Sequence, residues 1–225
     1  MKIIIFDAST LISFSMNGLL YIIRKLKENS DVKFIVTKEV VYEIIDKPIK
    51  IDRFKLEALK LKQLMEEGIL EMPTSIGINE KDISEKTNNI LDSANSIFKE
   101  SKQDIHIIDL GEASCVALSK ILNEKKIHNV MAIDERTTRM LCERPENLRK
   151  LLQKKLHTTI RYEREQTEQF KGLKIIRSSE IVYVAFKKNL TILKGKNSLD
   201  ALLYALKFKG CAISNDEIEE IKKLN

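Results

Sequence analysis

The chain begins with a short uninterrupted apolar run, KIIIF at residues 2–6, which ends directly in Asp7. A continuous β-branched run of this kind is typical of a strand buried on both faces, as in the centre of a parallel sheet. A second apolar run, NVMAI at residues 129–133, also ends in an acid, Asp134. These two runs predict an α/β protein with acidic residues where its central strands end.

The rest of the chain alternates between short apolar runs and longer helical patterns. Further strands are expected at residues 33–36, 69–72 and 173–176. Helices are expected at residues 10–27, 38–45, 52–67, 82–102 and 109–123, after the capping pair Ser178 and Ser179, and twice in the tail from about residue 198. Thr37 is placed to cap the second of these helices, and Pro48 to stop it. Strands that alternate with helices predict a parallel sheet, here of about five strands.

Composition limits the class of protein. A chain of 225 residues that is 43% hydrophobic and 32% charged can bury a core, which excludes wholesale disorder. Three scattered cysteines exclude a disulfide framework or a CxxC zinc site and favour a reduced, cytoplasmic compartment. No apolar run approaches the roughly 20 residues of a membrane span. Phosphate-binding glycine motifs and metal-binding histidine spacings are also absent from the sequence, so nucleotide-driven and dinucleotide-dependent enzymes are unsupported.

Positive charge is concentrated in one stretch. Residues 144–177 carry ten Lys and Arg against four Glu, a local excess of six that equals the net charge of the whole chain. This stretch could be a solvated helical face, a dimerisation arm, or a docking surface for RNA, because neutralised phosphates dominate non-specific nucleic-acid affinity. The residues expected to contact RNA are Lys154, Lys155, Arg161 and Arg164.

Four acids are placed to converge. Asp7 and Asp134 end strands, Glu43 lies on the helix after the second strand, and Glu112 lies in the first turn of the helix that begins at Asp109. In open α/β sheets, ligands bind outside the carboxyl ends of the strands. Clustered carboxylates stay ionised only beside a cation, so a hard oxygen-ligated metal, Mg²⁺ or Mn²⁺, is expected. Such a metal can polarise a phosphodiester and activate water.

Each acid also has a structural interpretation that its position leaves open. Asp7 and Asp134 could be helix N-caps. Asp109 and Glu112 have the D-x-x-E spacing of a capping box, which satisfies backbone donors without catalysis. Glu43 could be a surface charge, with Glu39 one turn earlier as its rival.

Two neighbouring features are also ambiguous. The segment FDAST shares the first acid of the D-x-D pattern of aspartate-nucleophile phosphatases, but Ser9 stands where the second acid would be. Arg136 and Arg139, just past Asp134, could contact a scissile phosphate or remain surface charges.

Four segments in order resemble the motifs of the PIN domain, a metal-dependent ribonuclease fold: IIIFDASTLISF, VTKEVVYEI, DLGEASCVALS and VMAIDERTTRML. In that family an acid ends the first strand, a Glu follows a V-x-x-E pattern, a third acid opens a helix with a small-residue face, and a fourth follows an apolar strand. The matching residues here are Asp7 with Ser9, Glu43, Glu112 and Asp134, with Glu112 in place of the commoner Asp. The GEAxxxAL third motif is similar to that of a mostly archaeal PIN branch.

The resemblance covers about residues 1–142 and 172–225 and implies one three-layer α/β/α domain. Residues 78–106 and 143–171 look like helical insertions, and residues 172–225 would complete the domain with its last strand and C-terminal helices. The implied activity is a Mg²⁺- or Mn²⁺-dependent endoribonuclease. The four acids would bind metal and catalyse, and the supporting residues would be Ser9, Thr10, Asp109 and Arg136. The alternative is a PIN-like RNA-binding or assembly module that keeps the acids but does not cleave.

Overall fold

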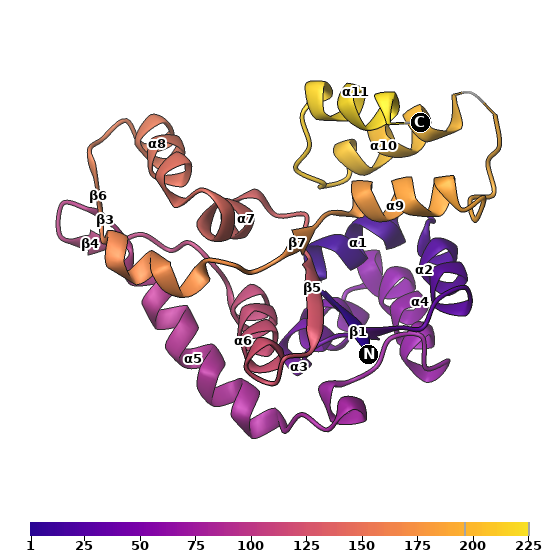
Figure 1. The fold of residues 1–225 in the computed structure, drawn as a ribbon, viewed down its shortest axis with the longest axis horizontal. Coiled ribbons are helices and arrows are strands. Elements are labelled where there is room, and N and C mark those ends of the chain that lie inside the picture. Colours follow the sequence, from indigo (N-terminus) through magenta and orange to yellow (C-terminus); the bar gives the residue numbers. More distant parts are fainter. Residues whose placement is uncertain (196, 225) are drawn as a thin grey trace.

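The N-terminal apolar run forms an inner strand of a parallel sheet in the computed structural model, which describes residues 1–195 and 197–224. The sheet has the order β2-β1-β5-β7, and every pair in it is parallel (Figure 1). Its strands are β1 (Lys2–Phe6), β2 (Val32–Ile35), β5 (His128–Ala132) and β7 (Ile175–Ile176). Ile3 and Ile5 of β1 are buried, as the unbroken apolar run predicts.

The strands that end at the two acids are parallel neighbours, as expected. Phe6 is the register partner of Ala132, and the backbone N–H of Asp7 donates to the carbonyl of Ala132 at 3.0 Å. Asp7 and Asp134 therefore follow the carboxyl ends of two adjacent strands, at one edge of the sheet.

Helices pack against both faces of this sheet. Ile4 and Phe34 face the side where α2 (Leu20–Glu28) and α9 (Ser178–Lys187) lie. On the other side, α6 (Leu110–Glu124) packs against β1 and β5. This packing agrees with the α/β class predicted from the sequence.

The expected fifth strand, at residues 69–72, is reduced to one bridge beside β2. Glu71 exchanges two backbone hydrogen bonds with this edge, donating to Phe34 and accepting from Val36, at 2.9 and 3.0 Å. The segment then runs into Pro73, which lacks an N–H and starts the 3₁₀ turn η4 (Pro73–Ile76). The described chain therefore has four strands in this sheet, with a short pairing segment at its edge.

Two expected helices are shorter than their sequence patterns. The pattern at residues 10–27 divides into α1 (Ala8–Met16) and α2 at Gly18, whose φ of 67° lies in the left-handed region that favours glycine. The pattern at residues 82–102 ends early, as α5 (Glu80–Ser96), because the next residues pair with a distant strand.

The two segments expected to be separate insertions meet in a second, antiparallel sheet. Its order is β4-β3-β6, from β3 (Phe98–Glu100), β4 (Gln103–Asp104) and β6 (Ile160–Tyr162). Phe98 stacks on Tyr162, with ring centroids 5.3 Å apart. The elements around β6 are α7 (Arg136–Glu143), α8 (Pro145–Leu156) and the 3₁₀ turn η5 (Arg164–Phe170). The antiparallel sheet lies away from the C-terminal helices in Figure 1.

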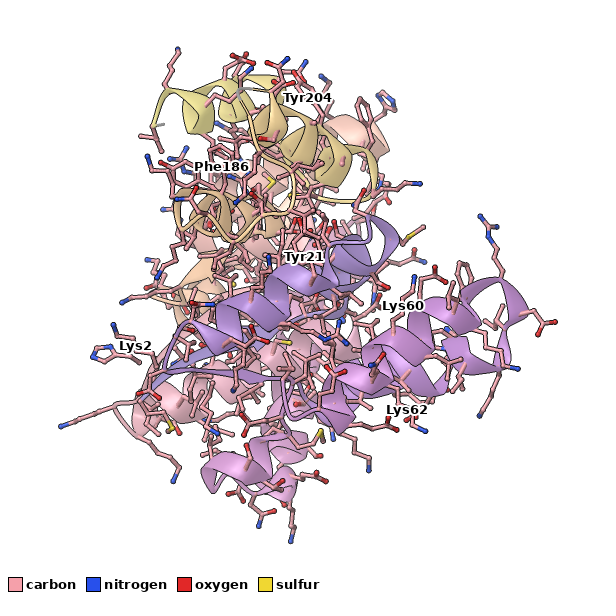
Figure 2. All side chains as sticks on the ribbon, turned by 90° about the vertical axis from the view of Figure 1, so that its right-hand side faces the viewer. Lys2, Tyr21, Lys60, Lys62, Phe186 and Tyr204 are labelled. Carbon is pink, nitrogen blue, oxygen red and sulfur yellow. The ribbon has the colours of Figure 1, made fainter. Side chains whose placement is uncertain are left out.

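The chain between β2 and α4 is irregular, and the tail is helical as expected. The elements are α3 (Lys38–Val41), the π-helix η1 (Tyr42–Asp46), the 3₁₀ turns η2 (Pro48–Lys50) and η3 (Asp52–Phe54), α4 (Lys55–Glu66), α10 (Ser198–Phe208) and α11 (Asn215–Lys223). Figure 2 shows α2, marked by Tyr21, between α4 with Lys60 and Lys62 and the layer that carries Phe186 and Tyr204. No helix of the described chain is long and apolar enough to cross a membrane.

Candidate functional site

Asp7 is held at the junction between β1 and α1. It caps α1, because its Oδ2 accepts a hydrogen bond from the backbone N–H of Ser9 at 3.0 Å and another from the Ser9 hydroxyl. The same hydroxyl accepts from the backbone N–H of Asp134 at 3.1 Å. Ser9 thus joins the ends of β1 and β5, and Asp7, only 1% exposed, is fixed beneath the surface.

Glu43 reaches the start of α6 through a close approach at Gly111. A Cβ added at Gly111 would lie 2.7 Å from Glu43 Oε1 and 2.9 Å from Oε2, so only glycine leaves room for this carboxylate. A hydrogen bond of 2.6 Å between the hydroxyls of Thr37 and Ser114 also joins the start of α3 to α6. Thr37 caps α3 as predicted.

Glu112 also has the structural role that its spacing predicted. Its Oε2 accepts a hydrogen bond from the backbone N–H of Asp109 at 2.8 Å, which is one half of a capping box at the start of α6. Asp109 itself is exposed, and its carboxylate pairs with His106 at 2.7 Å. Capping fixes the position of the Glu112 carboxylate without moving it away from the site.

Asp7, Glu43 and Glu112 act on one another electrostatically. Burial raises the pKa of all three carboxyl groups, and it raises that of Glu112 to about 7. For Glu43 and Glu112 the next cause of the raised pKa is the negative charge of Asp7. Burial also raises the pKa of the Cys115 thiol well above its ordinary value, and Asp7, Glu112 and Glu43 follow as causes. The contacts agree with this: the Cys115 thiol lies 3.8 Å from the carbonyl oxygen of Phe6, the residue before Asp7, and the Glu43 carboxylate lies against Gly111, the residue before Glu112.

The charge of Asp134 contributes to the raised pKa of Asp7, but both of its carboxylate oxygens are engaged elsewhere. Asp134 is fully buried; Oδ1 accepts from the backbone N–H of Ser178 and Oδ2 from its hydroxyl, each at 2.7 Å. The alternative role of Asp134 as the N-cap of the next helix does not apply, because Glu135 caps α7 by accepting from Thr138 N at 2.7 Å. Asp134 instead joins the end of β5 to the start of α9.

The three acids have the chemistry of a site for a hard cation, but their side chains are not arranged as a complete metal site. Within residues 1–195 and 197–224, no group of three or more His, Cys, Asp or Glu side chains is arranged to hold a metal ion. Asp7, Glu43 and Glu112 nevertheless offer carboxylate oxygens, the ligands that Mg²⁺ and Mn²⁺ prefer. Their raised pKa values show that the charged form of each carboxyl group is disfavoured, first by burial and, for Glu43 and Glu112, next by the charge of Asp7.

No protein-family model, no curated protein and no solved structure matches this chain.

The supporting residues expected from the sequence differ in their surroundings. Thr10, three positions after Asp7, is buried, and its hydroxyl has no hydrogen-bond partner in the described part of the chain. Arg136, at the start of α7, is exposed. Arg139 donates to the carbonyl of Ala212 at 2.9 Å, so its guanidinium group connects α7 to the tail.

The four basic residues expected to contact RNA are all exposed: Lys154, Lys155, Arg161 and Arg164. They lie on the last turn of α8, on β6 and at the start of η5. Arg161 is the register partner of Lys99 on β3, so both side chains leave the small sheet on the same face. The antiparallel sheet therefore adds a basic residue that the sequence interpretation did not include.

Sequence reasoning missed two residues that shape the site, Gly111 and Ser178. Gly111 carried a signal, since it lies inside a helix start where no turn requires glycine. The sequence predicts only a helix cap at Ser178, whereas the structure shows that Ser178 donates two hydrogen bonds to Asp134. Its partner lies 44 positions away, and one sequence gives no signal for that pairing.

Proposed function

We propose that this protein is a Mg²⁺- or Mn²⁺-dependent endoribonuclease with a PIN-like three-layer α/β/α fold, in which the edge segment at residues 69–72 takes the place of a fifth strand. The observation that carries the proposal is the convergence of Asp7, Glu43 and Glu112 from three elements at the carboxyl edge of the sheet, each with a raised pKa. Carboxylates crowded in this way gain most from a divalent cation.

Each residue of the site has a defined part in this proposal. Asp7, Glu43 and Glu112 would hold the metal, with Asp134 as a fourth ligand if Ser178 releases it. The bound cation would polarise the phosphodiester and lower the pKa of a water molecule. Ser9 fixes the Asp7 carboxylate by hydrogen bonding, and Gly111 leaves room for Glu43.

RNA would dock on the antiparallel sheet and α8, where positive charge is exposed. Arg161 and the neighbouring lysines Lys154 and Lys155 supply charges that can neutralise backbone phosphates, while Lys99 beside them is half-buried and pairs with Asp104 at 3.4 Å. The net positive charge of the chain lies in residues 144–177, which supports a polyanionic partner over an uncharged one.

The second candidate is an RNA-binding or assembly module with a PIN-like fold that does not cleave. The engagement of Asp134 favours it, because both oxygens of this carboxylate already accept hydrogen bonds from Ser178. A three-carboxylate site could bind a cation and RNA without efficient turnover.

Cleavage of a fluorescently labelled single-stranded RNA of mixed sequence separates the two candidates. We expect cleavage in Mn²⁺, loss of cleavage in EDTA, and no cleavage by Asp7→Asn, which keeps a capping side chain because Asn also caps helices. Asp92→Asn, a change at an exposed acid on α5, is the matched control and should cleave normally. RNA binding without cleavage in Mg²⁺ or Mn²⁺ would refute the enzyme and leave the binding module.

A further inference from the structure

An apolar cleft of about 950 Å³ opens beside the carboxylate site. It is lined by α1, η1, α4 and the start of α6, and its volume is in the upper part of the range of small-molecule sites. Large hydrophobic side chains around it are unusually exposed, among them Ile12, Met16, Tyr42, Phe54 and Leu110, at 38–55%. Contiguous apolar surface of this kind marks a binding site more often than a solvated face.

Two aromatic rings in the lining come from different elements. Tyr42 begins the π-helix η1 and is 55% exposed, and Phe54 ends η3 and is 38% exposed. Arg53 lies over the Phe54 ring, with its guanidinium carbon 5.4 Å from the ring centroid. Single π-turns are frequent at functional sites, and exposed aromatic rings are the side chains on which nucleobases stack.

The polar groups of the cleft are mainly hydrogen-bond acceptors. Five carboxylates and two lysines line it. On α4 the acid Glu66 lies 3.6 Å from Lys62, whereas Glu57, half-buried in the cleft, forms no ion pair in the part of the chain that the structure describes. Ser15 also lines the cleft, and its buried hydroxyl has no hydrogen-bond partner among the described residues. A ligand that donates hydrogen bonds would satisfy these groups.

The cleft is continuous with the proposed catalytic site. Glu43 and Asp109 line the cleft, and Glu43 is also one of the three acids of that site. A phosphate held at those acids would therefore have an adjacent nucleoside within reach of the apolar wall.

We propose that the cleft binds an unstacked nucleobase next to the scissile phosphate and favours bases that carry an amino group (adenine, cytosine or guanine) over uracil. Tyr42 and Phe54 provide stacking surface, and Glu57 accepts a hydrogen bond from the exocyclic amino group. A carboxylate only accepts hydrogen bonds. Adenine, cytosine and guanine each present an exocyclic amino group with two N–H donors, whereas uracil has carbonyl oxygens in those places and only its ring N3–H to donate. This inference rests on the proposed function, because the phosphate position comes from it.

Fluorescence anisotropy with short oligo(A), oligo(C) and oligo(U) RNAs in Mg²⁺ tests the site in the non-cleaving Asp7→Asn background. We expect oligo(A) and oligo(C) to bind about fivefold more tightly than oligo(U), as one additional hydrogen bond implies. Tyr42→Ala should weaken binding of all three, by roughly 5- to 100-fold, through lost stacking. Glu57→Gln adds an amide donor and should bring the preference close to one, largely by improving oligo(U) binding.

Leu59→Ala and Glu66→Gln are matched controls, because both residues lie on α4 outside the cleft lining. Both variants should bind each RNA as tightly as the Asp7→Asn protein does. Binding of RNA without base preference, unchanged by Tyr42→Ala and Glu57→Gln, would overturn the base site alone and leave the cleft to a protein partner. If neither the Asp7→Asn protein nor the wild type binds any RNA, the proposed function and the base site are both overturned. If the wild type cleaves RNA but all three oligonucleotides bind equally, the proposed function stands and the base site is overturned.

Discussion

The Glu112 carboxyl group should make the metal-free protein less stable at alkaline pH, and Glu112→Gln should remove that cost. Burial, followed by the charge of Asp7, raises its pKa to about 7 from an ordinary 4.5. The folded state therefore binds this proton more tightly than the unfolded chain, and folding becomes less favourable as pH rises from about 4.5 through 7. Glutamine keeps an oxygen that can accept the hydrogen bond from Asp109 N and carries no charge.

The size of the effect follows from the difference between the two pKa values. About 2.5 pH units at 1.36 kcal/mol each amounts to about 3 kcal/mol above pH 8. Because part of the carboxyl group remains in contact with water, we expect Glu112→Gln to increase the free energy of unfolding by about 1–3 kcal/mol at pH 8.5. At pH 5 the gain should be below about 1 kcal/mol, since the native carboxyl group is already protonated.

Urea unfolding of both proteins in EDTA, at pH 5 and pH 8.5, measures this difference. In a thermal scan the gain at pH 8.5 corresponds to roughly 2–12 °C in Tm for a chain of this size. Mn²⁺ should narrow the gap, because the cation stabilises the wild-type site by mass action. Equal stability of the two proteins at pH 8.5 without metal would refute the argument that Glu112 is held among uncompensated acids.

Glu217→Gln is a control of opposite sign. Glu217 has the same capping geometry, accepting from Ser214 N at 2.8 Å. Burial works to raise its pKa, but hydrogen bonds from Ser214 and Arg177 outweigh burial and lower the pKa to about 2. Its stabilising effect is present above about pH 4.5 and is lost only as pH falls toward 2, so Glu217→Gln should be destabilising at both pH 5 and pH 8.5.

Three further predictions concern the neighbours of the site. Gly111→Ala should displace the Glu43 carboxylate, because the new Cβ would lie within 3 Å of it, and should weaken the Mn²⁺-induced rise in Tm at least severalfold. Ser178→Ala should destabilise the fold by about 1–3 kcal/mol in urea unfolding, because a buried oxygen of Asp134 loses its donor; unchanged stability would show that this bond contributes little. Charge reversal of four exposed residues should weaken RNA binding and reduce the log–log salt slope by about 0.7 per lost contact; an unchanged slope with an altered oligomeric state by light scattering would assign the surface to dimerisation instead. The residues to reverse are Lys154, Lys155, Arg161 and Arg164.

The order of apolar and polar residues within each segment was enough to predict the strands and helices whose burial does not depend on a particular partner. The continuous apolar runs that became β1 and β5 required burial on both faces wherever they were placed. The helix that begins after Asp109 and the two tail helices were predicted for the same reason, since their apolar periodicity is complete within each segment. The position of Asp7 and Asp134 at strand ends followed directly from those runs.

Long-range contacts decided what the sequence left open. Residues 98–100 left the helical pattern because residues 160–162 pair with them, 60 or so positions away, and no local propensity records that partner. Glu112 caps α6 as its spacing predicted, and only the fold could show that the same carboxyl group is also buried near the charge of Asp7. Asp134 lies at the end of its strand as predicted, but its carboxylate accepts hydrogen bonds from Ser178. A buried carboxylate needs hydrogen-bond donors, and the start of α9 supplies them. Burial determined the pKa values and the hydrogen-bond partners of the acids in the site. Burial depends on the fold of the whole chain and not on any one segment.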